Sequence, residues 1–149
     1  PSASDAVPST PLLPYSPITK VDKTRTLNIK GMGMGMMGGP GHSASFTFDG
    51  KSFDPKRVDQ EVKFGTTEEW VINNPTGMHH PFHIHVWPFQ IVDDGFGYSH
   101  EGWHDTVNLP AGATVRIRIP FVDIAGTTVY HCHILDHEDA GMMGIVKVS

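Results

Sequence analysis

The alternation of side chains in residues 114–121 limits the fold more than any other feature of the sequence. Valine or isoleucine stands at positions 115, 117 and 119, and arginine stands at 116 and 118. A period of two is typical of a β-strand that buries one face. No segment of helix length keeps a period of 3.6, so we expect a β protein.

Short runs of the same kind recur along the chain and are separated by turn residues. Asp49-Gly50, Asp94-Gly95 and Ala125-Gly126 are examples of these turns. Many short strands with regular turns indicate an all-β sandwich or barrel. We predict strands at 26–29, 45–48, 69–72, 82–92, 114–121, 127–133 and 144–148.

Length and composition exclude several classes of protein. The chain has 149 residues, with 38% hydrophobic and 18% charged side chains, which suits one domain with a packed core. The formal net charge of −5 argues against a nucleic-acid binder, which normally carries a basic patch. No apolar run approaches the ~20 residues that a membrane helix needs.

Residues 1–24 have the composition of a linker. Five of the first seventeen residues are proline, and serines lie between them. Proline lacks the N–H that a strand needs, so we expect this segment to be extended or draped over a surface. We therefore predict an interdomain linker at 1–24 and one domain at 25–149. Because the chain starts at Pro1, we expect a processed chain or a piece of a longer one.

The histidines and the single cysteine are concentrated in two short windows. Seven of the ten histidines lie in residues 79–85 and 131–137, and Cys132 lies inside the second window. With one cysteine, no disulfide can form within the chain. Imidazole and thiolate are ligands that suit copper and zinc, so the windows indicate metal binding.

The first window reads His-His-Pro-Phe-His-Ile-His. On a strand, His83 and His85 project to the same face, with Ile84 on the other. His80 precedes Pro81, which favours an extended backbone, so His80 can serve a different site from the pair. The alternative is a cluster of histidines that are merely exposed, or buried and hydrogen-bonded.

The second window places two kinds of ligand on opposite faces of one strand. Cys132 points to one face, and His131 and His133 point to the other. Cys132, His137 and Met142, with His80 from the first window, form the donor set of a blue copper centre with a weak axial methionine. Met143 is a rival for the axial position, and core packing is the alternative for Met142. A structural zinc site is disfavoured because such sites use pairs of thiolates.

The two windows resemble the two carboxy-terminal copper motifs of the multicopper oxidases. The motifs are His-Pro-Phe-His-Ile-His at 80–85 and His-Cys-His-Ile-Leu-Asp-His-Glu-Asp-Ala-Gly-Met at 131–142. The stretch 102–107 is similar to one between these motifs in bacterial members. The resemblance covers about residues 45–149. It implies a cupredoxin-like Greek-key β-sandwich, in agreement with the predicted strands.

The resemblance also implies a role for each ligand. Type 1 copper would be held by His80, Cys132 and His137, with Met142 axial, and His83 would bind type 2 copper. The paired type 3 coppers would be bound by His85, His131 and His133. Glu138 matches an acid that supplies protons for oxygen reduction, although an exposed carboxylate without a role is an equal alternative. Asp136 and Asp139 are weaker candidates for that task.

The resemblance implies that this chain alone is incomplete. The family takes the other half of its trinuclear ligands from two H-x-H motifs in amino-terminal domains, and this chain has no further H-x-H. His42, His100 and His104 are isolated and cannot replace them. We therefore expect an amino-terminal partner, on the same precursor or a separate chain, and a periplasmic or secreted location.

The implied function is that of a copper-dependent, laccase-like oxidase. A phenolic or other organic donor, or a metal ion, would be oxidised at type 1 copper, and electrons would pass through 131–133 to the cluster that reduces dioxygen to water. A stand-alone blue-copper electron carrier is the alternative, although a carrier needs none of His83, His85, His131 and His133. A relative of copper nitrite reductases is disfavoured, because His131 and His133 flank Cys132 as paired-copper ligands.

Two further segments bear on this interpretation. The loop 31–41 carries Met32, Met34, Met36 and Met37, whose thioethers suit Cu(I). A loop with incidental methionines is the alternative. Val86-Trp87 follows His85, where many members of the family have glycine. This departure affects the neighbourhood of the ligands and not the ligands themselves.

Overall fold

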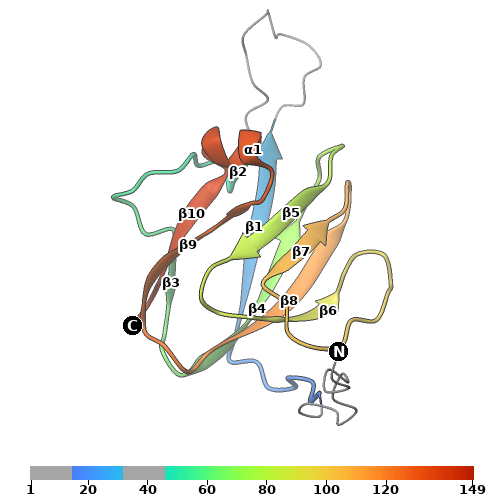
Figure 1. Ribbon diagram of the computed structural model, residues 1–149, viewed down its shortest axis with the longest axis vertical. Coiled ribbons are helices and arrows are strands. Elements are labelled where there is room, and N and C mark those ends of the chain that lie inside the picture. The colour runs from blue at the N-terminus through green and yellow to red at the C-terminus, as the bar shows by residue number, and fades with distance from the viewer. Residues whose placement is uncertain (1–14, 32–45) are drawn as a thin grey trace, which may run out of the picture.

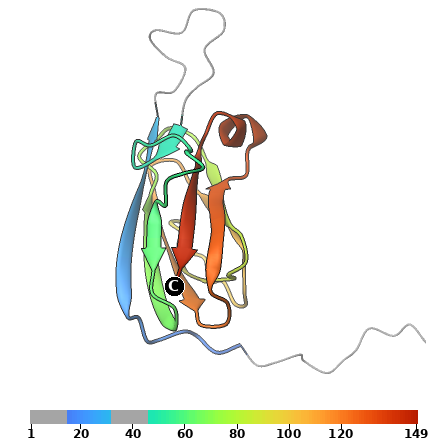
Figure 2. The same ribbon diagram turned by 90° about the vertical axis from the view of Figure 1, so that its left-hand side faces the viewer.

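The computed structural model describes residues 15–31 and 46–149, which form two five-stranded sheets packed face to face (Figures 1 and 2). The strands are β1 (Lys23–Gly31), β2 (Phe46–Phe48), β3 (Gln60–Val62), β4 (Thr66–Asn73), β5 (His80–Ile84), β6 (Gln90–Asp93), β7 (Thr106–Leu109), β8 (Thr114–Phe121), β9 (Gly126–Cys132) and β10 (Met143–Val148), and a short helix is α1 (Leu135–Asp139). The prediction of an all-β sandwich is confirmed.

The strand order places the two histidine windows next to each other. One sheet has the order β2-β1-β4-β8-β6, and the other has the order β3-β10-β9-β5-β7. In the second sheet β5 pairs with β9 in antiparallel fashion, with His83 opposite His131 and Phe82 opposite Cys132. Two segments about fifty residues apart in the chain are therefore neighbours on one sheet.

β8 forms as its alternation predicts. Val115, Ile117 and Ile119 are fully buried between the sheets, whereas Arg116 and Arg118 lie on the other face. Both arginines bind the carboxylate of Glu69 on β4. The strand therefore buries its apolar row between the sheets, and its two arginines neutralise the buried carboxylate of Glu69. This contact stabilises the pairing of β4 with β8.

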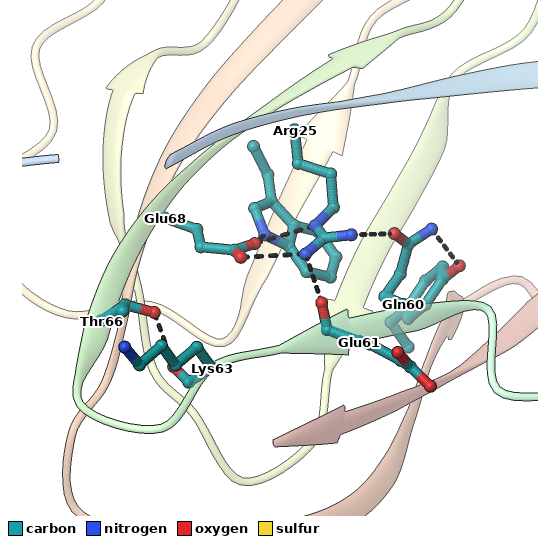
Figure 3. A network of polar contacts seen from close by, with 8 residues as sticks. Arg25, Gln60, Glu61, Lys63, Thr66 and Glu68 are labelled. Carbon is teal, nitrogen blue, oxygen red and sulfur yellow. Dashed lines mark hydrogen bonds and ion pairs between the residues drawn. The ribbon is translucent and has the colours of Figure 1, made fainter. Parts of the chain in front are cut away.

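A partly buried polar network connects the two sheets (Figure 3). Arg25 on β1 makes a two-pronged contact with Glu68 on β4, with N···O distances of 2.8 and 2.9 Å. The same guanidinium donates to Gln60 on β3, whose amide lies 3.3 Å from the Tyr130 hydroxyl on β9. Burial raises the pKa of Tyr130 above its usual value, so this phenol stays protonated. The network therefore holds β9 at Tyr130, two residues before Cys132.

The single strand predicted at 82–92 is wrong. β5 ends at Ile84, and β6 begins at Gln90 in the opposite sheet. The break is a tight turn in which the N–H of Trp87 donates to the carbonyl of His85, with Val86 between them at a φ of 76°. Pro88 follows and cannot donate to a ladder. Sequence analysis also missed β3, β7 and α1, which have three to five residues each.

Part of the predicted linker runs along the edge of a sheet. Gln90 on β6 accepts from the N–H of Ile18 and donates to the carbonyl of Ser16, at 2.7 and 2.9 Å. β1 begins at Lys23, and residues 1–14 lie outside the described residues, as do 32–41 of the methionine-containing loop. Within the described ranges, no helix is long and apolar enough to cross a membrane.

Candidate metal centre

Three ligand side chains meet at one end of the sandwich, and we call them the Cys132 cluster: His80, Cys132 and His137. The Sγ of Cys132 lies 3.7 Å from Nδ1 of His80 and 3.5 Å from Nδ1 of His137. The three potential ligand atoms lie within 4.8 Å of one another, and all three residues are buried. The first residue of β5, the last residue of β9 and α1 each supply one ligand atom to this cluster.

Residues 132–142 form a closed loop that returns His137 to Cys132. α1 is one short turn, and the N–H of His137 donates to the carbonyl of Ile134 at 2.9 Å. Met142 donates its N–H to His137 and accepts from the N–H of Cys132, at 2.9 and 3.0 Å. The Met142 side chain is fully buried, whereas Met143 is partly exposed and pairs with His131. Of the two candidates for the axial position, Met142 is therefore the buried one, and its backbone is bonded to both Cys132 and His137.

An aromatic ring covers the two imidazoles of the Cys132 cluster. The ring centroid of Phe46 on β2 lies 4.6 Å from that of His80 and 4.6 Å from that of His137. Gly31 pairs with Phe46 across β1 and β2, and a Cβ at this glycine would collide with the Phe46 ring. Phe46 therefore packs against both imidazoles of the cluster.

Burial controls the protonation of these ligands. It lowers the pKa of His80 to about 4, with a further contribution from His137, and it lowers the pKa of His137. It raises the pKa of the Cys132 thiol. At neutral pH both imidazoles are therefore uncharged with a lone pair available, and a metal ion that binds here displaces the thiol proton.

Four further histidines gather on the outer face of the sheet, and we call them the imidazole cluster: His83, His85, His131 and His133. Their ring centroids are 4.8 to 5.5 Å apart in neighbouring pairs. Nε2 of His85 lies 3.0 Å from Nε2 of His131, and His83, His85 and His131 each offer one ring nitrogen within 4.8 Å of the others. A depression of about 440 Å³ opens beside His83 and His85, over Val86 and Trp87.

Backbone carbonyls determine which ring nitrogen of His83 and of His131 is available to bind a metal ion. Nδ1 of His83 lies 2.9 Å from the carbonyl of Asp105 and 3.0 Å from the hydroxyl of Thr106. Nδ1 of His131 lies 3.0 Å from its neighbour's carbonyl and 3.2 Å from a carboxylate oxygen of Glu138. A carbonyl only accepts, so both Nδ1 atoms carry the proton and both Nε2 atoms present a lone pair.

Of the remaining candidates from the sequence that the structure describes, Glu138 contacts the imidazole cluster, whereas His100, His104, Asp136 and Asp139 do not belong to either cluster. The Nε2–H of His100 donates to the carboxylate of Asp94 at 2.8 Å, and the His100 ring lies 5.9 Å from that of His104. Asp136 and Asp139 are exposed on α1, whereas Glu138 is partly buried against His131. His42 lies outside the described residues. Sequence analysis missed Phe46, Thr76 and Thr106, because none of them is a metal-ligating residue type.

Comparison with known proteins identifies the family. A family model described as multicopper oxidase matches residues 26–149. The chain belongs to the multicopper oxidase family. It is 41% identical to the multicopper oxidase mco of Staphylococcus aureus over 116 residues, which cover 73% of this chain and 26% of that protein. It is 38% identical to the laccase of Bacillus subtilis over 113 residues, which cover 62% of this chain and 22% of the laccase.

Solved structures give the same family and the same fold. A multicopper oxidase from Campylobacter jejuni, described as a metallo-oxidase, is 32% identical with a TM-score of 0.79, over 92% of this chain and 32% of that chain. The chain thus spans about a quarter to a third of the length of the multicopper oxidases it matches. The expected family and the cupredoxin-like fold are confirmed, and copper is the cofactor that this family implies.

The donor atoms of the Cys132 cluster fit a copper ion. The Sγ of Cys132 lies 3.5 and 3.7 Å from the two Nδ1 atoms, so the three donor atoms are close enough to bind one ion. Two imidazoles, one thiolate and a buried thioether are the donor set of blue copper sites in this family of folds.

Proposed function

We propose that this chain is the carboxy-terminal cupredoxin domain of a laccase-like multicopper oxidase that couples one-electron oxidations to the reduction of dioxygen to water. Type 1 copper would be held by His80, Cys132 and His137 with Met142 as its fourth, weak ligand. Type 2 copper would be bound by His83. The type 3 pair would be bound by His85, His131 and His133.

One observation carries this proposal: adjacent residues of β9 serve both clusters. Cys132 contributes its sulfur to the buried cluster, and His131 contributes Nε2 to the exposed one. Copper bound at these residues supplies one-electron redox chemistry. The covalent link from Cys132 to His131 and His133 would give electrons a bonded route between the clusters. A stand-alone electron carrier has no use for this second set of imidazoles.

Glu138 is proposed to manage protons for oxygen reduction. Its carboxylate lies 3.2 Å from Nδ1 of His131, and its side chain is 27% exposed. Glu138 therefore touches both a cluster ligand and solvent, as a group that relays protons must. Asp136 and Asp139 have no such contact among the described residues.

The imidazole cluster is proposed to lie at an interface with an amino-terminal partner. Four imidazoles on an outer face are half of the set that the family resemblance implies, and His85 and His133 are exposed. The short span of the chain relative to its relatives supports a larger assembly. The donor is an organic molecule such as a phenol, or a metal ion, and the proposed location is periplasmic or secreted.

Copper loading tests the proposal. Wild-type protein is loaded with Cu(II), its copper is counted, and its absorption spectrum is recorded beside that of Cys132→Ser, which keeps the shape but removes the thiolate. We expect a blue absorption in wild type and none in the variant, since the colour depends on the copper–thiolate bond. A blue variant, or a colourless wild type with bound copper, would refute the assignment.

A further inference from the structure

We propose that Thr76, itself held by Asn74, is a positioning residue that keeps the ring proton of His80 on Nε2 and thereby aims Nδ1 at Cys132. The Thr76 hydroxyl lies 3.1 Å from Nε2 of His80, on the ring edge opposite to the cysteine sulfur. The inference rests on the proposed role of the Cys132 cluster as a copper site and names residues that act on it without being ligands.

The side-chain amide of Asn74 has one possible orientation. Its Nδ2 lies 2.8 Å from the carbonyl of Met78, 3.0 Å from that of Leu109 and 2.9 Å from that of Pro110. Three acceptors around this atom require that it is the NH₂ group. Asn74 is 1% exposed, so no water replaces these partners. The Oδ1 atom of Asn74 therefore faces Thr76.

The orientation of Asn74 decides where the hydroxyl proton of Thr76 goes. Oδ1 of Asn74 lies 2.7 Å from Oγ1 of Thr76 and also accepts from the backbone N–H of Thr76 at 3.1 Å. The carbonyl of Met78 is a poorer acceptor for the hydroxyl at 3.3 Å. A hydroxyl has one proton, and the shorter contact takes it. The lone pairs of Thr76 are then left to accept.

The acceptor at Thr76 determines the tautomer of His80. Since Thr76 accepts, Nε2 of His80 carries the proton and donates it. Nδ1 is then unprotonated, and its lone pair faces the sulfur of Cys132. His80 is fully buried and packs against Phe46 and His137, so its ring has little room to turn. Asn74 thus fixes the hydroxyl proton of Thr76, and Thr76 in turn fixes the ring proton of His80.

The loop that carries Thr76 is fixed to the neighbouring turn. The N–H of Asn74 donates to the carbonyl of Ala113 at 2.9 Å, and the carbonyl of Thr76 accepts from the N–H of Gly112 at 3.1 Å. Thr76 is therefore supported by backbone contacts that do not involve its side chain. Removal of the hydroxyl alone should change the hydrogen bond to His80 and leave the loop in place.

A hydrogen bond from Nε2–H to an oxygen makes the opposite nitrogen a stronger donor to a metal ion. A stronger nitrogen donor favours Cu(II) over Cu(I). Thr76→Val should therefore bind Cu(II) about 10-fold or more weakly and shift the type 1 reduction potential to a more positive value. Thr76→Ser keeps the hydroxyl and should restore both quantities.

The first experiment needs no metal. Nitrogen-15 NMR of the metal-free protein reports which ring nitrogen of each histidine is protonated, and His80→Gln identifies the His80 signals. We expect the Nε2–H form of His80 in wild type and in Thr76→Ser, and a mixture of forms in Thr76→Val. An Nδ1–H form in wild type would overturn the proposal, even if Thr76→Val did not fold.

The second experiment uses the copper-loaded protein. The type 1 potential and the copper EPR spectrum are compared for wild type, Thr76→Val, Thr76→Ser and the control Thr114→Val. Thr114 donates to Asn73 at 2.8 Å on an exposed strand end, so its variant loses a similar hydrogen bond without touching a histidine. We expect a changed potential and spectrum in Thr76→Val alone; an unchanged potential there would overturn the proposal. A colourless wild type would refute the copper assignment, whereas the NMR result would still decide the tautomer.

Discussion

Cys132 and His131 are covalent neighbours on β9, yet their side chains enter different clusters on opposite sides of the same strand. The Cys132 sulfur lies 3.5 Å from Nδ1 of His137, and Nε2 of His131 lies 3.0 Å from Nε2 of His85. The alternation of a β-strand causes this separation. One peptide link therefore joins the two candidate metal centres.

Replacement of the axial methionine should change the potential of the type 1 site without emptying it. In Met142→Leu, the remaining ligands His80, Cys132 and His137 still form a trigonal set, so the blue absorption should persist. Loss of the thioether should raise the reduction potential, measured by redox titration of the blue band. Met143→Leu is the control, and a shift in that variant alone would place the axial ligand at Met143.

Replacement of Glu138 should slow the supply of protons for oxygen reduction and leave the type 1 site unchanged. Glu138→Gln keeps an oxygen near His131 but cannot carry a proton at neutral pH. In the complete oxidase we expect about 100-fold slower oxygen uptake, with a normal blue absorption and normal anaerobic bleaching by the donor. Asp139→Asn is the control because Asp139 is exposed. Slow oxygen uptake in Asp139→Asn but not in Glu138→Gln would show that Asp139, and not Glu138, supplies the protons.

Val86→Gly should stabilise the domain. Val86 is the central residue of a tight turn at a φ of 76°, where a β-branched side chain is strained, and it is 53% exposed. Relief of about 1 kcal/mol should raise the melting temperature of the metal-free protein by about 3 °C in calorimetry. Val122 is equally exposed and has no positive φ, so Val122→Gly should lower the melting temperature. The reverse order would show that Val86 is not strained.

Asp94 should make the domain sensitive to acid. Burial alone would raise the pKa of Asp94, but His100 and the N–H groups of Phe96, Gly97 and Tyr98 lower it to about 2. Because the folded pKa lies below the unfolded value of about 3.9, the ionised carboxylate contributes stability above about pH 4. This contribution is lost as the pH falls from about 4 to about 2.

Denaturant unfolding between pH 2 and pH 6 measures this effect. Asp94→Asn should be less stable than wild type by at most about 2 kcal/mol at pH 6, and the difference should shrink toward pH 2. Asp123→Asn, at an exposed position, should follow the wild-type curve. A constant difference at all pH values would contradict the role given to the ionised form of Asp94.

The strand pattern carried much of the information about fold and site. The alternation at 114–121 matches β8 residue for residue, and the same rule separated Cys132 from its two flanking histidines. The break at Val86 could not be predicted in this way, because valine is a strand-forming residue and its positive φ arises from the crossing between sheets. β3 and β7 are too short to show a period.

The residues that orient the ligands were beyond sequence reasoning. Asn74-Pro75 reads as a turn signal, and nothing in the sequence shows that the amide of Asn74 is buried or that Thr76 contacts His80. Glu138 was one of three acids on one segment, and only the fold places it against His131. Ligand types are visible in a sequence, whereas hydrogen-bond partners depend on the packing of distant strands.

Oxygen uptake by the purified chain of 149 residues tests the central claim most directly. The chain is loaded with copper and supplied with a phenolic or cuprous donor, alone and after addition of an amino-terminal part that carries two H-x-H motifs. We predict a blue protein that does not sustain oxygen consumption alone and gains four-electron turnover when the partner completes the imidazole cluster. Sustained four-electron reduction of dioxygen by the isolated monomer would contradict the account.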